Sequence, residues 1–477
     1  MNEKVYKKTE GMKDMTENEM EFRVEKDSIG TKDVPENVYY GVQSLRAAEN
    51  FHITGLNMHP EIINSLAYIK KAAAITNCEA GLLDKRRTQA IVQACDEILE
   101  GKFREDFIVD PIQGGAGTSL NMNANEVIAN RAIEILGGKK GDYSVVNPND
   151  HVNCGQSTND VIPTAGKMTS LRLLKKLKKQ LLRLHSALEQ KADEFDGVIK
   201  MGRTQLQDAV PIRFSQEISG WRNMLEKTKK MLEASLPGLK ELALGGTAVG
   251  TGLNAPKNFG PEVAKVISEL TGKEFVTAEN KFHALTAKDD ITFAHGALKA
   301  LAADLMKIAN DVRWLASGPR CGLGEISIPE NEPGSSIMPG KVNPTQCEAM
   351  TMVAVQVMGN DAAIGFAASQ GNFELNVFMP VIAYNFLQSV RLLSDVIVSF
   401  NDNCAVGIKA NREKMKHNLH NSLMLVTALN PYIGYDNAAK TSKKAYKENI
   451  SLKEACVQLG FLTAEKFDEV FHPEEMA

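Results

Sequence analysis

The sequence predicts a mainly α-helical fold. Three long segments in the middle of the chain repeat apolar residues every three or four positions, and strand-like alternation is scarce. The first segment carries its stripe at Leu174, Leu177, Leu181, Leu184 and Leu188, the second at Ile218, Trp221, Leu225 and Leu232, and the third at Ala294, Leu298, Leu301, Leu305, Ile308, Val312 and Leu315. Helices of this length bury little surface alone, so we expect an up-and-down bundle, with contact to another subunit as the second interpretation of the stripes.

Composition sets the broad class of the protein. A chain of 477 residues that is 43% hydrophobic can form two or three domains with an ample core. Its net charge of −4 offers no basic excess for a phosphate backbone, which argues against nucleic-acid binding. The seven cysteines are scattered and form neither CxxC pairs nor zinc-type clusters, so we expect reduced thiols and a cytoplasmic protein.

The charged N-terminus has no apolar core of the secretory type, and residues 1 to about 20 are expected to form a disordered tail. No later run approaches the ~18 apolar residues that span a bilayer, so no membrane association is expected. We predict three domains: a mixed, mostly helical region at 1–155, a central helical bundle at 156–405 and a small helical region at 406–477.

The first polar cluster is the Gly-rich stretch GGAGTS at 114–119, followed by a helical segment. It lacks the Lys-Ser/Thr of a phosphate-binding loop and has no clear preceding strand. A Gly-rich turn with Thr118 and Ser119 at a helix start still presents backbone N–H groups and hydroxyls to a carboxylate. The alternative is that one of these two hydroxyls only caps the helix.

The second polar cluster, NPNDHVNCGQSTND at 147–160, stands just before the first long helix. Helix capping needs one or two of these side chains, and the surplus of neutral hydrogen-bonding groups suits a small polyanion. A third cluster, KMGRTQLQD at 200–208, is expected at the other end of that helix. About forty helical residues at ~1.5 Å each separate the two clusters by ~60 Å, so other chains must complete each site.

The fourth motif, GSSIMPGKVNP at 334–344, reads first as a surface loop rich in Gly and Pro. Together with the three clusters, it resembles the aspartase/fumarase superfamily over nearly the whole chain, and this Ser-Ser loop is the specific signature of that family. The resemblance implies a mainly α fold of three domains, with central helices that form a twenty-helix core in a homotetramer. Each active site would draw on three subunits and eliminate across a Cα–Cβ bond of a small dicarboxylate to release fumarate or a fumaryl product.

The resemblance also implies roles for individual residues. Elimination next to a carboxylate generates a dianionic aci-carboxylate, which requires a base and positive potential. Ser335 would be the base, on a loop that closes over the substrate. The substrate-binding positions would be Thr118, Ser119, Ser157, Thr158, Asn159, Thr204, Gln205, Lys341, Asn343 and Arg46, with Ser336, Glu348 and His151 as further candidates. His151 either belongs to the site or caps a helix. No cofactor and no metal ligand are implied, and activation by a divalent metal such as Mg²⁺ is left open.

The motifs point to two subfamilies. YYGVQSLRAAENF, GGAGTS and QSTND resemble aspartate ammonia-lyase, whereas NPTQCEAM and QGNFELNVF resemble class II fumarase. Hydroxide is a poor leaving group, and fumarases place a His after Gly-Arg-Thr, paired with a Glu at the position of Glu348. In this sequence the residue after Gly-Arg-Thr is Gln205, which cannot shuttle a proton. The α-ammonium of aspartate is already protonated and can leave as ammonia without such a residue. We therefore expect an aspartase, a carbon-nitrogen lyase, with fumarase as the alternative; argininosuccinate and adenylosuccinate lyases match less well. A non-catalytic, crystallin-like relative is disfavoured because Ser335, Lys341 and Asn343 are intact.

Overall fold

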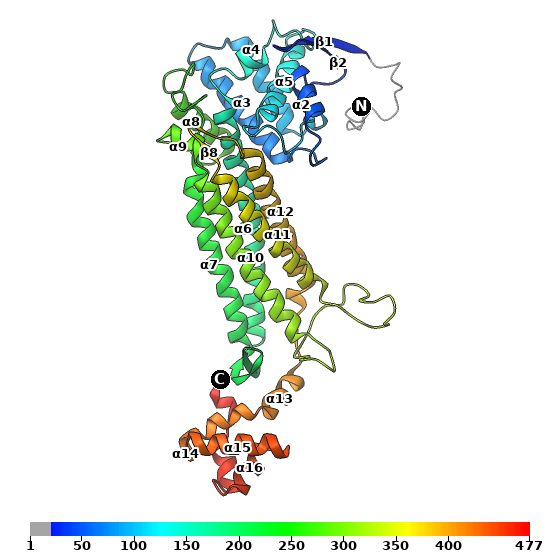
Figure 1. The fold of residues 1–477 in the computed structure, drawn as a ribbon, viewed down its shortest axis with the longest axis vertical. Coiled ribbons are helices and arrows are strands. Elements are labelled where there is room, and N and C mark those ends of the chain that lie inside the picture. The colour runs from blue at the N-terminus through cyan, green and yellow to red at the C-terminus, as the bar shows by residue number, and fades with distance from the viewer. Residues whose placement is uncertain (1–20) are drawn as a thin grey trace. The chain divides into compact units, whose positions relative to one another are not determined.

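The computed structural model describes residues 21–477 and is mainly helical, as the sequence predicts (Figure 1). The expected tail at 1–20 lies outside the described residues. Five long helices dominate: α6 (Thr158–Glu194), α7 (Phe214–Lys240), α10 (Asp289–Leu315), α11 (Thr345–Ala368) and α12 (Met379–Asn403). Every predicted stripe residue lies on α6, α7 or α10 and is at most 6% exposed. The stripes are therefore used for packing inside the chain.

The described chain forms two compact units, and each is assembled from three separate segments. Unit 1 contains the chain up to 176 together with 231–299 and 356–391, and unit 2 contains 177–230, 300–355 and 392–477. Each of the five long helices contributes one part to each unit. The three domains with boundaries at 155 and 405 remain a prediction.

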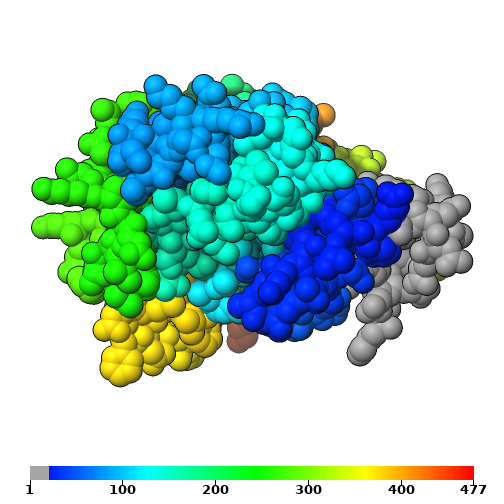
Figure 2. All heavy atoms as spheres, turned by 90° about the horizontal axis from the view of Figure 1, so that it is seen from above, coloured from blue at the N-terminus to red at the C-terminus, as the bar shows by residue number. Residues whose placement is uncertain are grey.

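Unit 1 contains a layer of shorter helices beside its parts of the long helices. Its further elements are β1 (Phe22–Lys26), β2 (Thr31–Pro35), α2 (Val42–Asn50), α3 (Pro60–Glu79), α4 (Lys85–Leu99), η3 (Arg104–Asp106), α5 (Thr118–Ile135), η4 (Pro148–Val152), β5 (Glu241–Leu242), α8 (Phe259–Thr271), β6 (Val276–Thr277), α9 (Lys281–Thr286), β8 (Gly371–Asn372) and β9 (Leu375–Asn376). α3 packs against α4 and α8, and α5 packs against α4 and α2. Figure 2 shows these early elements in blue and cyan with the later segments in green and yellow beside them.

A buried polar chain joins three long helices inside unit 1. The His295 ring on α10 contacts Asp361 Oδ1 of α11 through Nδ1 at 2.9 Å and Ser389 Oγ of α12 through Nε2 at 2.8 Å. His295 and Ser389 are fully buried. Because buried polar groups require partners, these contacts fix how the three helices face one another in this unit.

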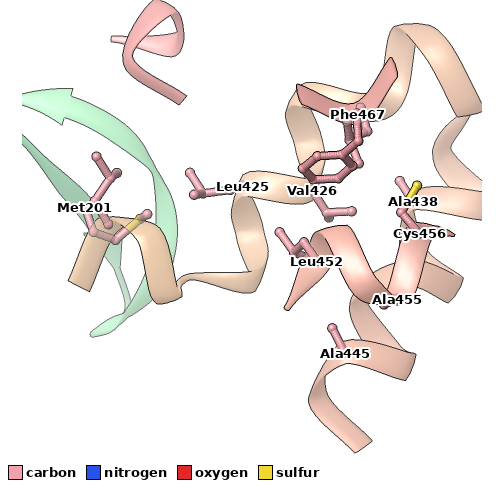
Figure 3. Close-up of a cluster of buried hydrophobic side chains, with 11 residues drawn as sticks. Met201, Leu425, Val426, Ala438, Ala445, Leu452, Ala455, Cys456 and Phe467 are labelled. Carbon is pink, nitrogen blue, oxygen red and sulfur yellow. The ribbon is translucent and has the colours of Figure 1, made fainter. Parts of the chain in front are cut away.

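Unit 2 combines the remaining parts of the long helices with the C-terminal region. Its further elements are β3 (Ile199–Thr204), β4 (Gln207–Arg213), β7 (Ile326–Ser327), η5 (Ala405–Gly407), β10 (Lys409–Ala410), α13 (Arg412–Asn421), η6 (Leu423–Leu429), α14 (Asn430–Ile433), α15 (Tyr435–Glu448), α16 (Leu452–Gln458), α17 (Ala464–Val470) and η7 (Pro473–Met476). Figure 3 shows the C-terminal core, in which Leu425, Val426, Leu452 and Phe467 pack together near Met201 of β3. The C-terminal helices are thus anchored on the β3–β4 hairpin.

Strands occur only in pairs among the described residues. The pairs β1–β2, β3–β4, β7–β10 and β8–β9 are antiparallel, and β5–β6 is parallel. None extends into a larger sheet, which agrees with the scarcity of strand-like alternation. The structure therefore depends on helix packing for its core.

The expectation that no run approaches 18 apolar residues holds for α12, because Arg391 and Asp395 interrupt it. Residues 379–407, which contain α12, are nevertheless long and apolar enough by composition to cross a membrane, with a mean hydropathy of 1.3 over 18 residues. Half of that window is buried, and its core residues include Phe386, Val390, Leu393 and Ile397. A buried bundle helix has the same composition, so packing accounts for this apolarity.

Candidate active site

The Gly-rich turn at 114–117 leads directly into α5, as the sequence predicts. Gly117 occupies the N-cap position with φ 78° and has no side chain, and the Leu120 N–H of the first turn donates instead to Gln113 Oε1 at 2.7 Å. Capping by Thr118 or Ser119 is therefore wrong: Thr118 is the first helical residue and its side chain is exposed. A Cβ at Gly115 would lie 1.6 Å from the Val377 carbonyl oxygen, so only glycine fits there. The turn places the N-terminus of α5 beside the exposed Thr118 and the half-buried Ser119, an arrangement suited to an anion.

The second cluster forms the first turn of α6. Ser157 caps this turn: its Oγ accepts from the Asn159 N–H at 3.2 Å, and its own N–H donates to Asp160 Oδ1 at 3.0 Å. Pro163 is the sixth helical residue rather than part of the first turn. Because proline has no N–H, the Asn159 carbonyl loses its helical donor. Capping thus uses few of the polar groups gathered here, as expected.

The first turns of α5 and α6 meet through a residue that sequence reasoning missed. Asn121 of α5 donates through Nδ2 to the Thr158 hydroxyl at 3.1 Å and to Asn153 Oδ1 at 3.2 Å. Lys70 of α3 donates to Asn153 Oδ1 at 2.8 Å and to Gln156 Oε1 at 3.0 Å. The available signals were a lysine among the mostly apolar buried positions of α3 and the series of asparagines on α5. Unit 1 therefore brings together the Gly-rich turn and the Gln156–Asn159 turn.

His151 performs a backbone role. Its Nδ1 accepts from the Asn147 N–H at 2.8 Å, at the start of the short helix η4. Burial lowers the pKa of His151, which favours the neutral ring that this bond requires. These contacts favour the helix-capping interpretation over the site interpretation.

The third cluster lies in the β3–β4 hairpin, after the end of α6 rather than in the helix itself. Thr204 pairs with Gln207 across a two-residue turn, and Gln205 and Leu206 both have positive φ, 56° and 62°. Positive φ at both turn residues is typical of the tight hairpins that usually contain Asn or Gly. Side chains other than Asn or Gly in this conformation carry strain of the kind that is often retained at functional positions.

Buried ion pairs hold that hairpin in unit 2. Arg203 donates twice to Glu325, at 2.6 and 3.0 Å, and Lys200 Nζ lies 3.0 Å from Glu217 Oε2 and 3.4 Å from Glu325 Oε2. Lys200 and Glu325 side chains are essentially unexposed. Burial alone would raise the pKa of Glu325, but the Arg203 hydrogen bonds and the Lys200 charge lower it. Arg203 and Lys200 thus fix the backbone that presents Thr204.

This cluster makes the stability of the protein pH-dependent. A carboxylate with a lowered folded-state pKa stabilises the fold above its ordinary value of 4.5, and this contribution is lost as the pH falls through the folded pKa. Glu325→Gln should lower the free energy of unfolding by about 3 kcal/mol at pH 7, because Arg203 loses its carboxylate partner and Lys200 keeps only Glu217. It should also flatten the acid limb of stability against pH in denaturant unfolding. The exposed Glu332→Gln is the control, and equal effects of both variants would contradict this assignment.

The Ser-Ser loop positions Ser335 differently from Ser336. Ser335 Oγ accepts from the backbone N–H groups of Ile337 at 3.2 Å and Met338 at 3.0 Å. Such donors stabilise negative charge on the oxygen, as a serine base requires. The Ser336 side chain is exposed. The two hydroxyls therefore differ in their contacts, and the role of Ser335 as the base stays a prediction.

The loop closes on itself through Lys341 and Asn343. The Gly334 N–H donates to the Lys341 carbonyl at 2.8 Å, and Asn343 Nδ2 donates to the Gly334 carbonyl at 2.7 Å. A Cβ at Gly334 would lie 2.5 Å from the Lys341 carbonyl oxygen, which explains the glycine. Asn343 therefore holds the base of the loop, while the Lys341 side chain is exposed. Glu348 lies in the first turn of α11, just after the loop.

Arg46 does not join either group of candidates. Its Nε lies 2.8 Å from Asp27 Oδ2, and its Nη2 donates to the Gly30 carbonyl at 3.2 Å. These contacts give Arg46 a structural role beside the β1–β2 hairpin. Across residues 21–477, no group of three or more His, Cys, Asp or Glu side chains is arranged to hold a metal ion.

Unit 1 thus holds Thr118, Ser119 and the Ser157–Asn159 turn, and unit 2 holds the hairpin turn and the Ser-Ser loop. A helical fold with these elements defines a class of lyase. Residues 30–359 match the lyase family model, and residues 425–477 match the model of the fumarase C C-terminus. The chain belongs to the aspartase/fumarase superfamily.

Individual relatives refine this assignment. The chain is 59% identical to a class II fumarate hydratase of Campylobacter jejuni and 58% identical to one of Bacillus cereus, each over 96% of this chain and 99% of the relative. Among solved structures, a class II fumarase from Schistosoma mansoni matches with a TM-score of 0.93 and 43% identity, over 96% of this chain and 99% of that one. A fumarate lyase:delta crystallin from Brucella melitensis, bound to cobalt, matches with a TM-score of 0.92 and 44% identity, over 96% and 100%.

These relatives overturn the expected activity. Relatives that are 55–59% identical over 95–96% of the chain are named class II fumarate hydratases, so the choice of aspartate ammonia-lyase is wrong. The expected enzyme class, a carbon-nitrogen lyase, is wrong for the same reason. The wrong expectation rested on Gln205. Glutamine cannot protonate a departing hydroxide, and fumarase was disfavoured on the premise that the side chain at this position must do so.

Proposed function

We propose that the protein is a class II fumarate hydratase, a carbon-oxygen lyase that interconverts L-malate with fumarate and water. The observation that carries this proposal is the full-length identity to relatives of that name. The donors to Ser335 Oγ support it, because hydration and dehydration of this substrate both pass through proton transfer at a weakly acidic carbon.

In the dehydration direction, Ser335 Oγ takes a proton from the CH₂ carbon of malate. The electron pair passes into the adjacent carboxylate, and the Lys341 ammonium is proposed to stabilise the resulting aci-carboxylate. The pair then forms the C=C bond as the C–O bond breaks, and the departing hydroxide takes up a proton from solvent to become water. Ser335, which acts as the alkoxide, then returns the proton it took from carbon to solvent. Thr118, Ser119, Ser157, Thr158, Asn159 and Thr204 are proposed to bind the two carboxylates and the hydroxyl.

Each active site is proposed to be shared by several copies of the chain in a homotetramer. α6 has 37 residues, or about 55 Å at 1.5 Å per residue, and the Ser157–Asn159 turn and Thr204 flank its two ends. α11 also leaves large apolar side chains exposed, with Met352 66%, Val355 61% and Phe366 77% accessible. An apolar helix that exposes such residues suits burial against another copy. A cytoplasmic location also remains a prediction.

The proposal is tested by a side-by-side assay. Fumarate absorbance is followed from L-malate and, separately, from L-aspartate at equal enzyme concentration, with Ser335→Ala as the background. We expect malate dehydration to be the faster reaction. Faster deamination of aspartate in the wild type would overturn the proposed function.

Gln205 also allows a prediction about how the leaving hydroxide is protonated. Gln205→His should raise kcat for malate dehydration by at least ~10-fold, because an imidazole can protonate the departing hydroxide. Gln207→His, on the same hairpin, is the matched control and should leave kcat unchanged. An unchanged rate in Gln205→His, or an equal gain in both variants, would show that a proton source elsewhere already serves this step.

A further inference from the structure

Lys70 is a buried cation that the proposed reaction does not use. It lies on α3 with no exposed surface, in a helix whose neighbouring buried positions are mostly apolar. Removing an ammonium from water is unfavourable unless polar groups and opposite charge compensate for the loss. The partners of Lys70 therefore indicate why this position tolerates a charge.

Those partners belong to the segment that presents the Gln156–Asn159 turn. Lys70 Nζ donates to Asn153 Oδ1 at 2.8 Å and to Gln156 Oε1 at 3.0 Å. Asn153 Nδ2 donates in turn to the Gln156 carbonyl at 3.2 Å, and Gln156 Nε2 donates to the Val152 carbonyl at 3.1 Å. The ammonium thus joins two side chains that brace the residues immediately before Ser157.

The same network reaches the Thr158 hydroxyl. Asn153 Oδ1 accepts from both Lys70 and Asn121, and Asn121 Nδ2 also donates to Thr158 Oγ1. Because the Thr158 oxygen accepts this bond, its own proton remains available to a substrate oxygen. Lys70 thus fixes the orientation of the Asn153 side chain. Asn153 and Thr158 both accept hydrogen bonds from Asn121, so the orientation of Asn153 also affects the position of the Thr158 hydroxyl.

Charges around Lys70 are few. Burial lowers its pKa to about 7, and the opposing effects come from Asp160 of α6 and, more weakly, Cys95 of α4. Asp160 is itself held by the backbone N–H groups of Ser157, Gly245 and Thr247. The direct partners Asn153 and Gln156 are neutral. Lys70 is therefore sensitive to any anion that arrives beside the turn.

We propose that Lys70 is a positioning residue for the substrate site: it orients the Gln156–Asn159 turn and the Thr158 hydroxyl through Asn153, and it adds positive potential for a dicarboxylate. This inference rests on the proposed function and extends it to a residue that does not touch the substrate. A bound dicarboxylate brings two negative charges, which favour the charged form of Lys70 and so raise its pKa in the complex. Free enzyme and complex should consequently respond differently to pH.

The test compares Lys70→Met with Lys288→Met. Lys288 is another buried lysine, and its Nζ donates to the carbonyls of Ala284, Leu285 and Ala287, outside this network. Lys70→Met should lower kcat/KM for malate by at least ~10-fold, as expected for loss of charged hydrogen bonds. Lys288→Met should stay within about 3-fold at a temperature where both are folded. Equal activities of the two folded variants would overturn the inference.

A pH profile separates this role from a purely structural one. Lys70 is charged below its pKa of about 7, so log(kcat/KM) of the wild type should fall above that pH. The profile of kcat, which reports the complex, should fall only at higher pH. In Lys70→Met, the pH profiles of kcat/KM and of kcat should fall at the same pH. Coinciding profiles in the wild type would overturn the role of charge.

Asn121→Leu covers the case in which Lys70→Met does not fold. Asn121 Oδ1 is buried without a hydrogen-bond partner, so leucine removes an unsatisfied atom as well as the donor to Thr158. We expect KM for malate to rise at least ~5-fold with Lys70 intact; an unchanged KM would contradict the proposed route to Thr158. A wild type without malate turnover would instead reject the proposed function, so the two failures are distinguishable.

Discussion

Ser335→Ala should lower kcat by at least ~10³-fold while the protein remains folded, because the substitution removes the group that accepts the proton. Ser335 is partly exposed, and its hydroxyl oxygen accepts hydrogen bonds from Ile337 and Met338, which belong to the same loop. Its loss should therefore change the free energy of unfolding little. Steady-state kinetics with malate and a thermal unfolding measurement check the two expectations.

Ser336→Ala is the matched control for this prediction. It removes the same atom from the next residue, whose side chain is exposed. Its kcat should remain within about 5-fold of the wild type. Equal losses in the two variants would show that the loop, rather than the Ser335 hydroxyl, supplies the chemistry.

Mixing two inactive variants should restore activity if sites are shared between chains. Ser335→Ala subunits and Asn159→Ala subunits are denatured together at equal amounts and refolded. By random assortment, about a quarter of the sites would then take an intact Ser335 from one chain and an intact Asn159 from another. Activity should rise from a residual level to a substantial fraction of the wild type.

The control for the mixing experiment uses two residues of one loop. Ser335 and Lys341 are joined through the Gly334–Lys341 backbone bond, so both reach a site from the same chain. A mixture of Ser335→Ala and Lys341→Met subunits should therefore stay inactive. Recovery in this mixture, or none in the first, would contradict shared sites of the proposed kind.

Much of the fold could be predicted because its signal is repeated. Each long helix carries many apolar positions at one spacing, and the stripe from Leu174 to Leu188 proved to be buried throughout. The Ser-Ser loop was found for another reason: Gly334 and Ser335 perform tasks that few other residues can perform. Periodicity and strict local requirements are both visible in a single sequence.

The parts that could not be predicted depend on contacts between distant residues. Lys70 and Asn153 are 83 positions apart, so the sequence around the lysine does not indicate which residue accepts its hydrogen bond. Arg46 was expected at the substrate, and its ion pair with Asp27 is not visible in the sequence pattern. Glu325 was missed because its partners Arg203 and Lys200 lie more than a hundred positions earlier.

The choice of substrate failed for a different reason. It rested on a single side chain, Gln205, and on the assumption that this side chain must protonate the leaving group. A water molecule held in a site can perform that transfer instead. The expected substrate therefore depended on one residue, whereas the identity to the relatives is measured over 96% of the chain.

The division of each unit among three separate segments has a consequence for how the protein is made. Unit 1 is complete only when residue 391 has been synthesised, and unit 2 requires the C-terminus. Neither can finish folding on a growing chain until most of the polypeptide has left the ribosome, because contacts between distant segments must wait for both partners. Nascent chains should therefore expose apolar helix faces for most of translation, which makes them substrates for chaperones that bind such surfaces.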